Sequence, residues 1–463
     1  MFYVNVLLLF FSLGLWSLDY IPSATILSFF ILLLLGLNAY IFSNKFVCLV
    51  RLFIFSLPAL IFAVLHLIYG YNVLLSSFAI AYSTPELRDK AFLFLLISLL
   101  SSIIGLSLTP RFSGRYLFGS IYNIVLLLPS RLSLLFVLVY SFVVVYGYGG
   151  FISQSNIYGS KSSAISQYFA VGQLLFYFFI AIAIVQDLLR FKLVRKITIF
   201  TCIFSLLICM SGGGRLDFGP QIIILLILLP YLQGFRFQSL KKLFLYGLSK
   251  NTAIYLFQLI FMLLIVLAIL LFVGFSRFDA LSSLLEKNPF LIELPTGSTY
   301  FFLDTFNSTI GGIFSVLVQD TLYPSYFGFL FNIPPLFLGL PRLLTAEYFI
   351  TAYKGTVFTV GAVFEPTEAF LNLNILGLAI VPLIISSFYS WLQHLFDNAL
   401  VSFKSIASSP SQLFYAVSSF VVILMFLLIS PRGIWYQSFS LFRCLTFIII
   451  LNFIGMITTF RSP

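Results

Sequence analysis

Long apolar runs separated by short polar stretches follow one another along most of the chain. Each run is long enough for a helix to cross a hydrocarbon core, which takes roughly 20 residues. The runs lack the apolar–polar alternation expected of membrane barrel strands. The pattern therefore predicts an all-α, polytopic membrane protein with about twelve transmembrane helices. The predicted spans are 3–18, 22–42, 52–70, 91–108, 132–148, 166–186, 196–211, 218–234, 252–274, 370–392, 411–430 and 435–457, with 117–129 as an uncertain extra.

One long polar interruption, residues 275–369, holds eight of the fourteen acidic residues. It divides the chain into a bundle of about nine spans over 1–274, a large loop, and about three spans over 370–463. The run 313–340 is apolar, but prolines and an aspartate break it. We expect short surface or re-entrant helices there, with a thirteenth span as the alternative. The loop is where polar chemistry is expected.

Composition supports the membrane class. The chain is 61% hydrophobic and 8% charged, with a mean hydropathy of +1.11. A soluble domain could not bury that much apolar surface. The chain has only four cysteines and two histidines, without a CxxC motif. The cysteines fall in or beside apolar runs, so they are expected to pack in the interior, and neither a disulfide framework nor a zinc site is indicated.

The distribution of basic residues predicts the orientation. Fifteen of the 25 lysines and arginines, Arg51 among them, fall in loops after even-numbered spans or at the C-terminus. The positive-inside rule places these loops and both termini in the cytoplasm. The large loop 275–369 then lies on the opposite face, the periplasmic one in a bacterium. The net charge of +11 is explained by this topology, so no nucleic-acid partner is expected.

Five arginines remain on the outer face: Arg88, Arg215, Arg277, Arg342 and Arg432. The last four lie in or beside loops that the orientation rule would leave free of positive charge. Arginines in such places suit a local anionic partner. The alternative for each one is a side chain that reaches from a helix end to lipid headgroups.

A glycine-rich turn, Ser211-Gly-Gly-Gly-Arg215, joins two predicted spans at the outer surface. Gly213 and Gly214 permit close backbone approach, and the next helix would point its positive dipole end at the same place. Arg215 could bind a phosphate through two hydrogen bonds. These features favour an anion site, although a plain tight turn between helices is also possible. The turn is not a Walker loop, because no GK[ST] follows.

Three carboxylates are candidates for proton transfer. Glu365 and Glu368 lie three residues apart at a predicted helix start, where desolvation near the bilayer would suit one of them for the task. Pro366 at the first turn, with Thr367 and Glu368, is also a common way to begin and cap a helix. Glu365 lies outside the capping positions and is therefore the first candidate. Asp304, inside the large loop, is the second and Glu368 the third.

These motifs, in this order and on these sides, resemble the Wzy-type polysaccharide polymerases. The resemblance covers about residues 155–445, and residues 1–130 match only in hydropathy. One departure is the Gly339-Leu340 pair before Arg342, where relatives often have further charges, which makes the role of Arg342 less secure than that of Arg215. The matching segments are Asn156-Ile-Tyr-Gly159, Gly213-Gly214-Arg215, Asp304-Thr305-Phe306, Pro341-Arg342, Pro366-Thr367 and Arg432-Gly433.

The resemblance implies an O-antigen polymerase, a glycosyltransferase of the bacterial inner membrane with its site open to the periplasm. Such an enzyme joins oligosaccharide repeat units carried on undecaprenyl pyrophosphate during lipopolysaccharide biosynthesis. It needs no metal or other cofactor. The implied partners are these lipid-linked oligosaccharides and membrane lipid, and a chain-length regulator protein is a candidate partner.

Within this scheme the outer arginines Arg215, Arg432, Arg342 and Arg277 would neutralise the pyrophosphate, with Gly213 and Gly214 shaping the turn. A carboxylate, Glu365, Asp304 or Glu368, would accept the proton of the attacking sugar hydroxyl. Two other functions remain open. An O-antigen ligase generally relies on a histidine in the outer loop, and neither His66 nor His394 lies there. A lipid-linked oligosaccharide flippase would more naturally show paired internal halves and no long outer loop.

Overall fold

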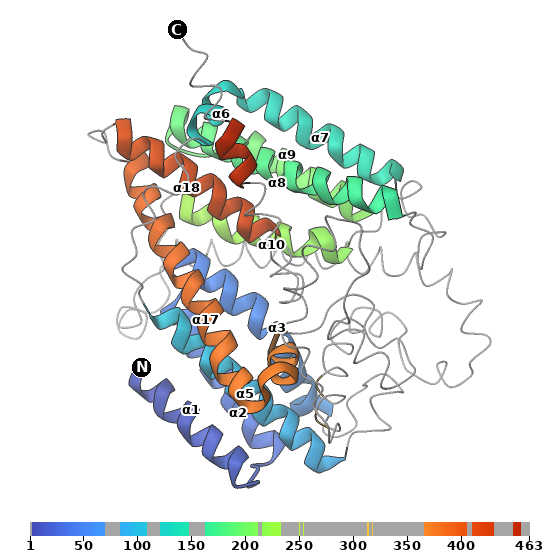
Figure 1. Ribbon diagram of the computed structural model, residues 1–463, viewed down its shortest axis with the longest axis vertical. Helices are drawn as coiled ribbons and strands as arrows, with labels where there is room; N and C mark the ends of the chain where they lie inside the picture. The colour runs from blue at the N-terminus through green and yellow to red at the C-terminus, as the bar shows by residue number, and fades with distance from the viewer. Residues whose placement is uncertain are drawn as a thin grey trace, which may run out of the picture. The chain divides into compact units, whose positions relative to one another are not determined.

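A computed structural model describes residues 2–69, 84–108, 121–147, 163–211, 215–232, 365–404, 410–429 and 448–454, with the isolated positions 250, 253, 313 and 317. Every regular element within these residues is an α-helix, which confirms the all-α prediction for this part of the chain. The helices, shown in Figure 1, are α1 (Phe2–Ser17), α2 (Ala24–Ile41), α3 (Phe46–Tyr69), α5 (Pro85–Ser107), α6 (Ile121–Leu127), α7 (Ser130–Gly147), α8 (Ser163–Phe191), α9 (Lys196–Ser211), α10 (Arg215–Leu232), α17 (Glu365–Lys404) and α18 (Pro410–Ile429).

Six of the described helices are long and apolar enough to cross a membrane: α2, α3, α5, α8, α17 and α18. The pair α6 and α7 would add a seventh if it forms one bent span, whereas α1 and α9 are apolar but shorter. The chain is therefore a helical membrane protein. The predicted spans 252–274 and 435–457 lie largely outside the described residues, as does the loop up to residue 364, so the count of twelve spans stays a prediction.

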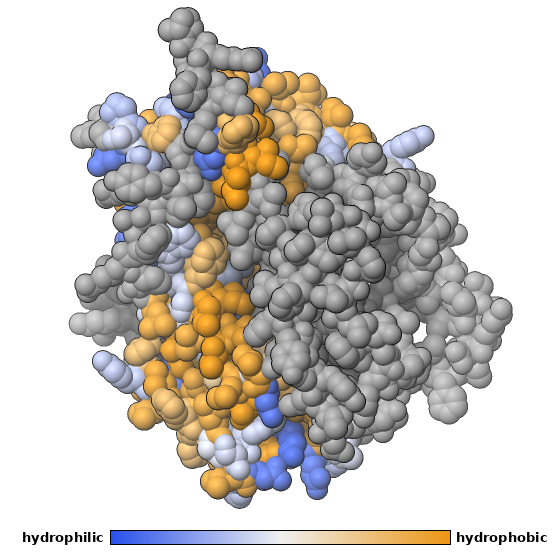
Figure 2. Space-filling model, viewed as in Figure 1, coloured by the Kyte–Doolittle hydropathy of each residue, from blue (hydrophilic) through white to orange (hydrophobic). Residues whose placement is uncertain are grey.

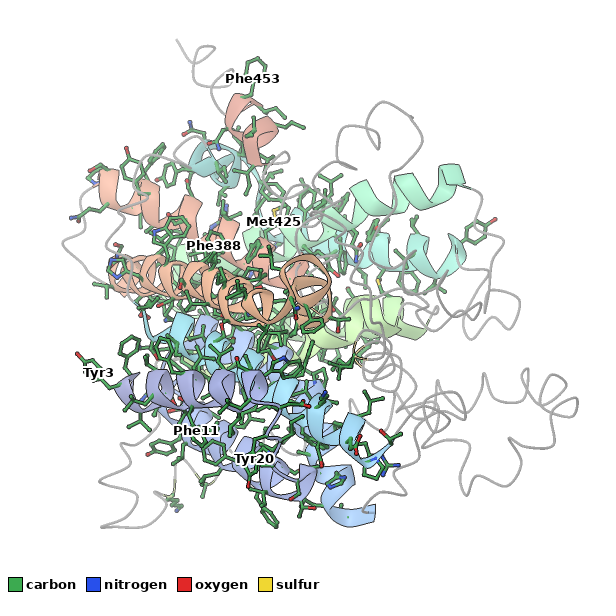
Figure 3. The ribbon with its side chains drawn as sticks, turned by 60° about the horizontal axis from the view of Figure 1, so that its bottom comes forward. Tyr3, Phe11, Tyr20, Phe388, Met425 and Phe453 are labelled. Atoms are coloured by element: carbon green, nitrogen blue, oxygen red, sulfur yellow. The ribbon has the colours of Figure 1, made fainter. Side chains whose placement is uncertain are left out.

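Large apolar side chains cover much of the outer surface of these helices, as the orange areas of Figure 2 show. On α1, Tyr3 is 80% exposed and Phe11 63% exposed, and Tyr3 projects from the end of the helix in Figure 3. On α7, Phe142 and Tyr146 are also exposed. Faces of this kind suit contact with lipid tails, where apolar exposure carries no hydrophobic cost.

The described helices belong to two compact units. Unit 1 contains α1, α2, α3, α5 and the part of α17 up to Trp391, and unit 2 contains α6 to α10, α18 and the rest of α17. Each unit brings together segments that are far apart in the sequence. The predicted division into two bundles around a large loop stays a prediction, because most of residues 233–364 lie outside the described residues.

Helix α5 is the centre of unit 1, where it packs against α1, α2 and α3. Every residue from Ala91 to Leu106 is buried, as expected of a helix that is apolar on all sides. At one end of α5 the Asp89 carboxylate accepts a hydrogen bond from the backbone amide of Ala24 at 2.6 Å. The side chain of Ser23, at the usual capping position, makes no capping bond. The bond from Asp89 therefore caps the start of α2 in its place.

Small side chains allow α5 and α17 to approach closely. The hydroxyl of Ser101 donates to the carbonyl of Ala379, and the hydroxyls of Ser102 and Ser386 are 2.7 Å apart. Gly105 lies directly against the backbone of Leu383. Membrane helices commonly associate through small residues and interhelical hydrogen bonds of this kind, because the hydrophobic effect does not drive helices together within lipid.

Helix α17 is interrupted at Asn374, where φ is 55° and ψ is −145°. The segment 365–373, called the arm below, folds back so that Ala369 contacts Gly377. The Phe370 ring on the arm lies 5.9 Å from that of Trp16 and 5.5 Å from that of Phe94. Residues 365–369, the last of the predicted loop, are helical, in line with the helix start predicted at Glu365 and Glu368. A helix break that the sequence did not indicate occurs inside the span predicted over 370–392.

In unit 2, α6 and α7 meet at a bend of 90°. Such a bend frees backbone carbonyls that need new partners in a membrane. The side-chain amide of Gln186 on α8 donates to the carbonyls of Val125 and Leu128, the latter at 2.9 Å. One side chain from a later helix therefore satisfies two carbonyls of the bend.

The next residue, Asp187, holds the corner between α8 and α9. Its buried carboxylate accepts bonds from the Arg195 backbone amide at 3.0 Å, the Arg195 Nε at 2.9 Å and the Thr198 hydroxyl at 2.6 Å. The Arg195 guanidinium also donates to the hydroxyl of Ser130 at 3.2 Å. Asp187 thus caps the start of α9 and connects it to the start of α7.

Candidate functional site

The described residues include three of the predicted site residues. Glu365 is described in full, whereas Glu368 and Arg215 are described by their backbone, as members of α17 and α10. The remaining candidates lie outside the described residues: Asp304, Arg277, Arg342, Arg432, Gly213 and Gly214.

Two of the motifs begin helices, as the sequence predicts. Helix α10 starts at Arg215, directly after the glycine-rich turn, and α17 starts at Glu365 with Pro366 in its first turn. Proline is well suited to this position because the first helical amides have no partner within the helix. The first backbone amides of α10 therefore have no partner within the helix, and the positive end of the helix dipole lies at Arg215, which suits an anion.

A hydrogen bond joins α10 to α18 within unit 2. The side-chain amide of Gln221 donates to the carbonyl of Leu428 at 3.0 Å. Gln221 follows Arg215 by six residues, and Leu428 precedes Arg432 by four. Both bonded residues are buried in unit 2. The start of α10 and the end of α18, which flank the two arginine-bearing turns in the sequence, are thus bonded to each other.

A second arrangement, in unit 1, is a buried ion pair that the sequence did not predict. The guanidinium of Arg51 on α3 faces the carboxylate of Glu365: Nη2 donates to Oε1 at 2.7 Å, and Nη1 lies 2.7 Å from Oε2 as an ion pair. The side chains are 1% and 2% exposed. Charge-assisted contacts of this kind are among the strongest that side chains form.

The surroundings of Arg51 complete its coordination. Its Nε donates to the hydroxyl of Ser386 at 3.2 Å, and Ser386 is in turn within 2.7 Å of the Ser102 hydroxyl. The guanidinium carbon lies 4.6 Å from the ring centre of Phe55 and 5.3 Å from that of Tyr389. The positive charge of Arg51 is thus stabilised inside an apolar bundle by an ion pair, by a hydrogen bond and by two aromatic rings.

This geometry differs from the one expected of Glu365. The sequence suggests a carboxylate at the mouth of a span, whereas the structure places it inside unit 1 with both oxygens facing a cation. Protonating Glu365 would leave the charge of Arg51 buried without its partner, and an unpaired buried charge is costly. The arrangement is therefore well suited to holding the arm, and its carboxylate is not exposed to a ligand approaching from solvent.

The sequence-based reasoning missed Arg51 because it began the third span too late. That span was predicted over 52–70, which left Arg51 in a cytoplasmic loop, but α3 begins at Phe46 and Arg51 lies inside it. An arginine within an apolar helix is itself a signal that a partner is needed. Arg443, in the span predicted over 435–457, was recognised by that criterion and lies outside the described residues.

The part of the chain that the structure describes contains no group of three or more His, Cys, Asp or Glu side chains placed to hold a metal ion. Cys48, Cys202 and Cys209 are buried, in agreement with their predicted packing role. Fold and site together define a helical membrane protein with buried polar connections between its helices. Comparison of the chain with protein-family models, curated proteins and solved structures finds no match.

Proposed function

We propose that the chain is a membrane glycosyltransferase that polymerises oligosaccharide repeat units carried on undecaprenyl pyrophosphate, as the Wzy-type polymerases do. In this reaction the bond between the first sugar of the growing chain and its pyrophosphate breaks. A hydroxyl of the incoming lipid-linked unit forms the new glycosidic bond. The hydroxyl proton passes to a carboxylate, and undecaprenyl pyrophosphate leaves as the anion.

The observation that supports this proposal best is the bond between Gln221 and Leu428. It ties together the two helix ends that flank Arg215 and Arg432 in the sequence. A pyrophosphate leaving group develops negative charge as its bond to the sugar breaks. Arginines and helix-terminal amides held at these helix ends would stabilise this charge without reorganisation.

The proposed roles follow from the chemistry of each residue. Arg215, with the first amides of α10, binds the pyrophosphate, and Arg432 binds it from the end of α18. Gly213 and Gly214 let the backbone approach the phosphate oxygens. Arg342 and Arg277 supply further positive charge from the long segment 275–364.

The sequence offers three carboxylates as the base, Glu365, Asp304 and Glu368. The burial of Glu365 against Arg51 favours Asp304 or Glu368 for this role. The site faces the periplasm of a bacterial inner membrane in this scheme. The basic loops and both termini are then in the cytoplasm.

The decisive experiment is genetic. The gene is deleted from its bacterial host and the lipopolysaccharide is separated on a gel, before and after return of the wild-type gene or of the Arg215→Ala variant. A polymerase defect leaves core lipopolysaccharide capped by a single repeat unit, and only the wild-type gene restores the ladder. Loss of all capped forms would instead indicate a ligase or a flippase, and an unchanged ladder would refute the proposal.

A further inference from the structure

We propose that Arg51 and Glu365 form a latch that holds the arm 365–373 inside unit 1, and that both are positioning residues for the proposed polymerisation. This inference rests on the proposed function for its consequence on activity. The latch itself rests on the contacts of unit 1 alone. It assigns Glu365 a role other than that of the base.

The first step is the position of the latch at the end of the long segment. Glu365 is the first residue of α17 and directly follows the segment 275–364, which carries Asp304, Arg277 and Arg342. The Arg51 guanidinium therefore binds the point at which that segment joins the helical bundle. Holding this point fixes one end of the segment relative to α3 and α5.

The second step concerns how the arm is held, since its described residues Glu365, Thr367, Ala369 and Phe370 are all buried. Phe370 packs against the rings of Trp16 and Phe94, and Ala369 lies against Gly377. Both contacts are near the Asn374 break. At the far end of the arm, the ion pair is the polar contact that ties residue 365 to another helix. Removing one partner would free this end and leave the other charge buried.

The third step is that Arg51 is matched to Glu365 in geometry as well as charge. The guanidinium uses two nitrogens for the carboxylate and its Nε for Ser386, while its faces lie near Phe55 and Tyr389. A lysine could not make this planar, paired contact. The fixed orientation is what a latch requires, and a proton on this carboxylate would remove the charge that Arg51 faces.

The test compares Arg51→Met, Glu365→Gln and the double variant. Each single variant leaves one buried charge or polar group without its partner, whereas the double variant removes both charges together. If Arg51 and Glu365 form a latch, the double variant should be less impaired in polymer synthesis than either single variant. If Glu365 is the base, the double variant should be as inactive as Glu365→Gln alone.

The first readout is the accessibility of the arm. A thiol is introduced by Ala369→Cys in protein whose four native cysteines have been replaced, and its reaction with a membrane-permeant maleimide is timed. Ala369 is 2% exposed, so the thiol should react slowly when Arg51 and Glu365 are present. Either single variant should raise the rate about tenfold or more, and the double variant should return it to within about threefold of the parent, since the uncompensated charge is gone.

Two controls accompany this readout. Ala91→Cys, which is 0% exposed on α5, should stay protected in every variant and so reports that unit 1 remains folded. Asp19→Asn removes the exposed ion pair between Asp19 and Lys90, whose side chains are 76% and 39% exposed. Such pairs contribute little, so the arm should remain protected.

The second readout is the length of the polymer made in cells or in membranes supplied with lipid-linked repeat units. Each single variant should shorten it strongly, with partial recovery in the double variant. A Glu365→Gln protein that makes no polymer while its arm stays protected would overturn the latch and restore Glu365 as a base. Labelling that is unchanged in all three variants would also overturn it. If the wild-type protein makes no polymer, the proposed function fails, and the labelling still decides whether the latch exists.

Discussion

The side-chain amide of Gln221 and the backbone carbonyl of Leu428, 207 residues apart in the sequence, are joined by a hydrogen bond of 3.0 Å inside unit 2. The Leu428 carbonyl, near the end of α18, thus accepts a hydrogen bond from a side chain on α10. In an apolar surrounding such a bond fixes the relative position of two helix ends, because neither group has water as an alternative partner.

Replacing Gln221 with leucine should loosen this connection. The carbonyl of Leu428 would lose its donor, and we expect a loss of ~1 kcal/mol of stability, as measured for interhelical bonds in membrane proteins. Polymer synthesis should fall as well, because the proposed pyrophosphate site lies in the turns that adjoin these helix ends in the sequence. Thermal unfolding in detergent and polymer length on gels measure the two effects.

Gln173→Leu is the matched control for this variant. The amide of Gln173 donates to the Tyr177 hydroxyl within the same helix, α8, so its loss should leave the packing of helices nearly unchanged. Equal melting temperatures and polymer lengths for the two variants would contradict a special role for Gln221.

The arginines of the proposed pyrophosphate site should be essential for activity and dispensable for folding. Arg215→Ala and Arg432→Ala should each slow chain extension about a hundredfold or more, the effect typical of losing a group that stabilises transition-state charge. Membrane insertion and melting temperature should stay at wild-type values. Quantitative analysis of the polymer ladder, with immunoblots of the membrane fraction, measures both.

Arg131→Ala serves as the comparison for these variants, since Arg131 is an exposed arginine at the start of α7. It should leave the ladder unchanged. Wild-type polymer length in both Arg215→Ala and Arg432→Ala would remove the basis of the anion site.

A methyl group at position 105 should force α5 and α17 apart. The Cβ of Gly105→Ala would overlap the carbonyl oxygen of Leu383 and lie 2.9 Å from the Cβ of Ser386. Overpacking of this kind typically costs about 1–3 kcal/mol. The melting temperature in detergent should therefore fall by several degrees.

Gly36→Ala on α2 provides the comparison, because nothing lies within 4 Å of its added Cβ. It should melt at the wild-type temperature or slightly above it, since alanine favours the helix. A Gly105→Ala protein that melts with the wild type would show that α5 and α17 do not pack this closely.

The corner at Asp187 should be important for stability. Asp187→Ala removes the acceptor of three bonds from Arg195 and Thr198 and leaves the start of α9 uncapped. Hydrogen bonds to a charged group contribute about 1.5–3 kcal/mol each, and Arg195 is partly exposed and regains water. We therefore expect a net loss of about 2 kcal/mol, seen as a lower melting temperature. Asp397→Ala, at an exposed position on α17, should have almost no effect.

Helix positions were the most predictable part of this protein. Apolar runs of the right length identify spans without knowledge of their neighbours, because a membrane helix satisfies its backbone by itself. The starts of α10 at Arg215 and α17 at Glu365 were also predictable, since glycine, proline and the first polar residue mark them locally. The Asn374 break was not, because the left-handed conformation there depends on packing between Ala369 and Gly377.

Partners across long sequence separations were the least predictable. Nothing near Arg51 in the sequence indicates Glu365, and a boundary error of six residues was enough to assign the arginine to a loop. Gln221 carried a comparable signal, a polar amide in an otherwise apolar helix, without indicating which carbonyl it would bind. Sequence can show that a membrane helix needs a polar partner, whereas only the fold identifies the partner.

The Arg51–Glu365 pair also constrains how the protein is made. The two residues are 314 positions apart, so at roughly 5–20 residues per second the ribosome adds Glu365 roughly 15–60 s after Arg51. During that interval α3 has left the ribosome with its arginine unmatched. Water, lipid headgroups or the insertion machinery must solvate the charge of Arg51 until the later segment is inserted. Insertion of unit 1 is therefore completed late, and a nascent chain shortened before residue 365 should be a preferred substrate for membrane quality-control proteases.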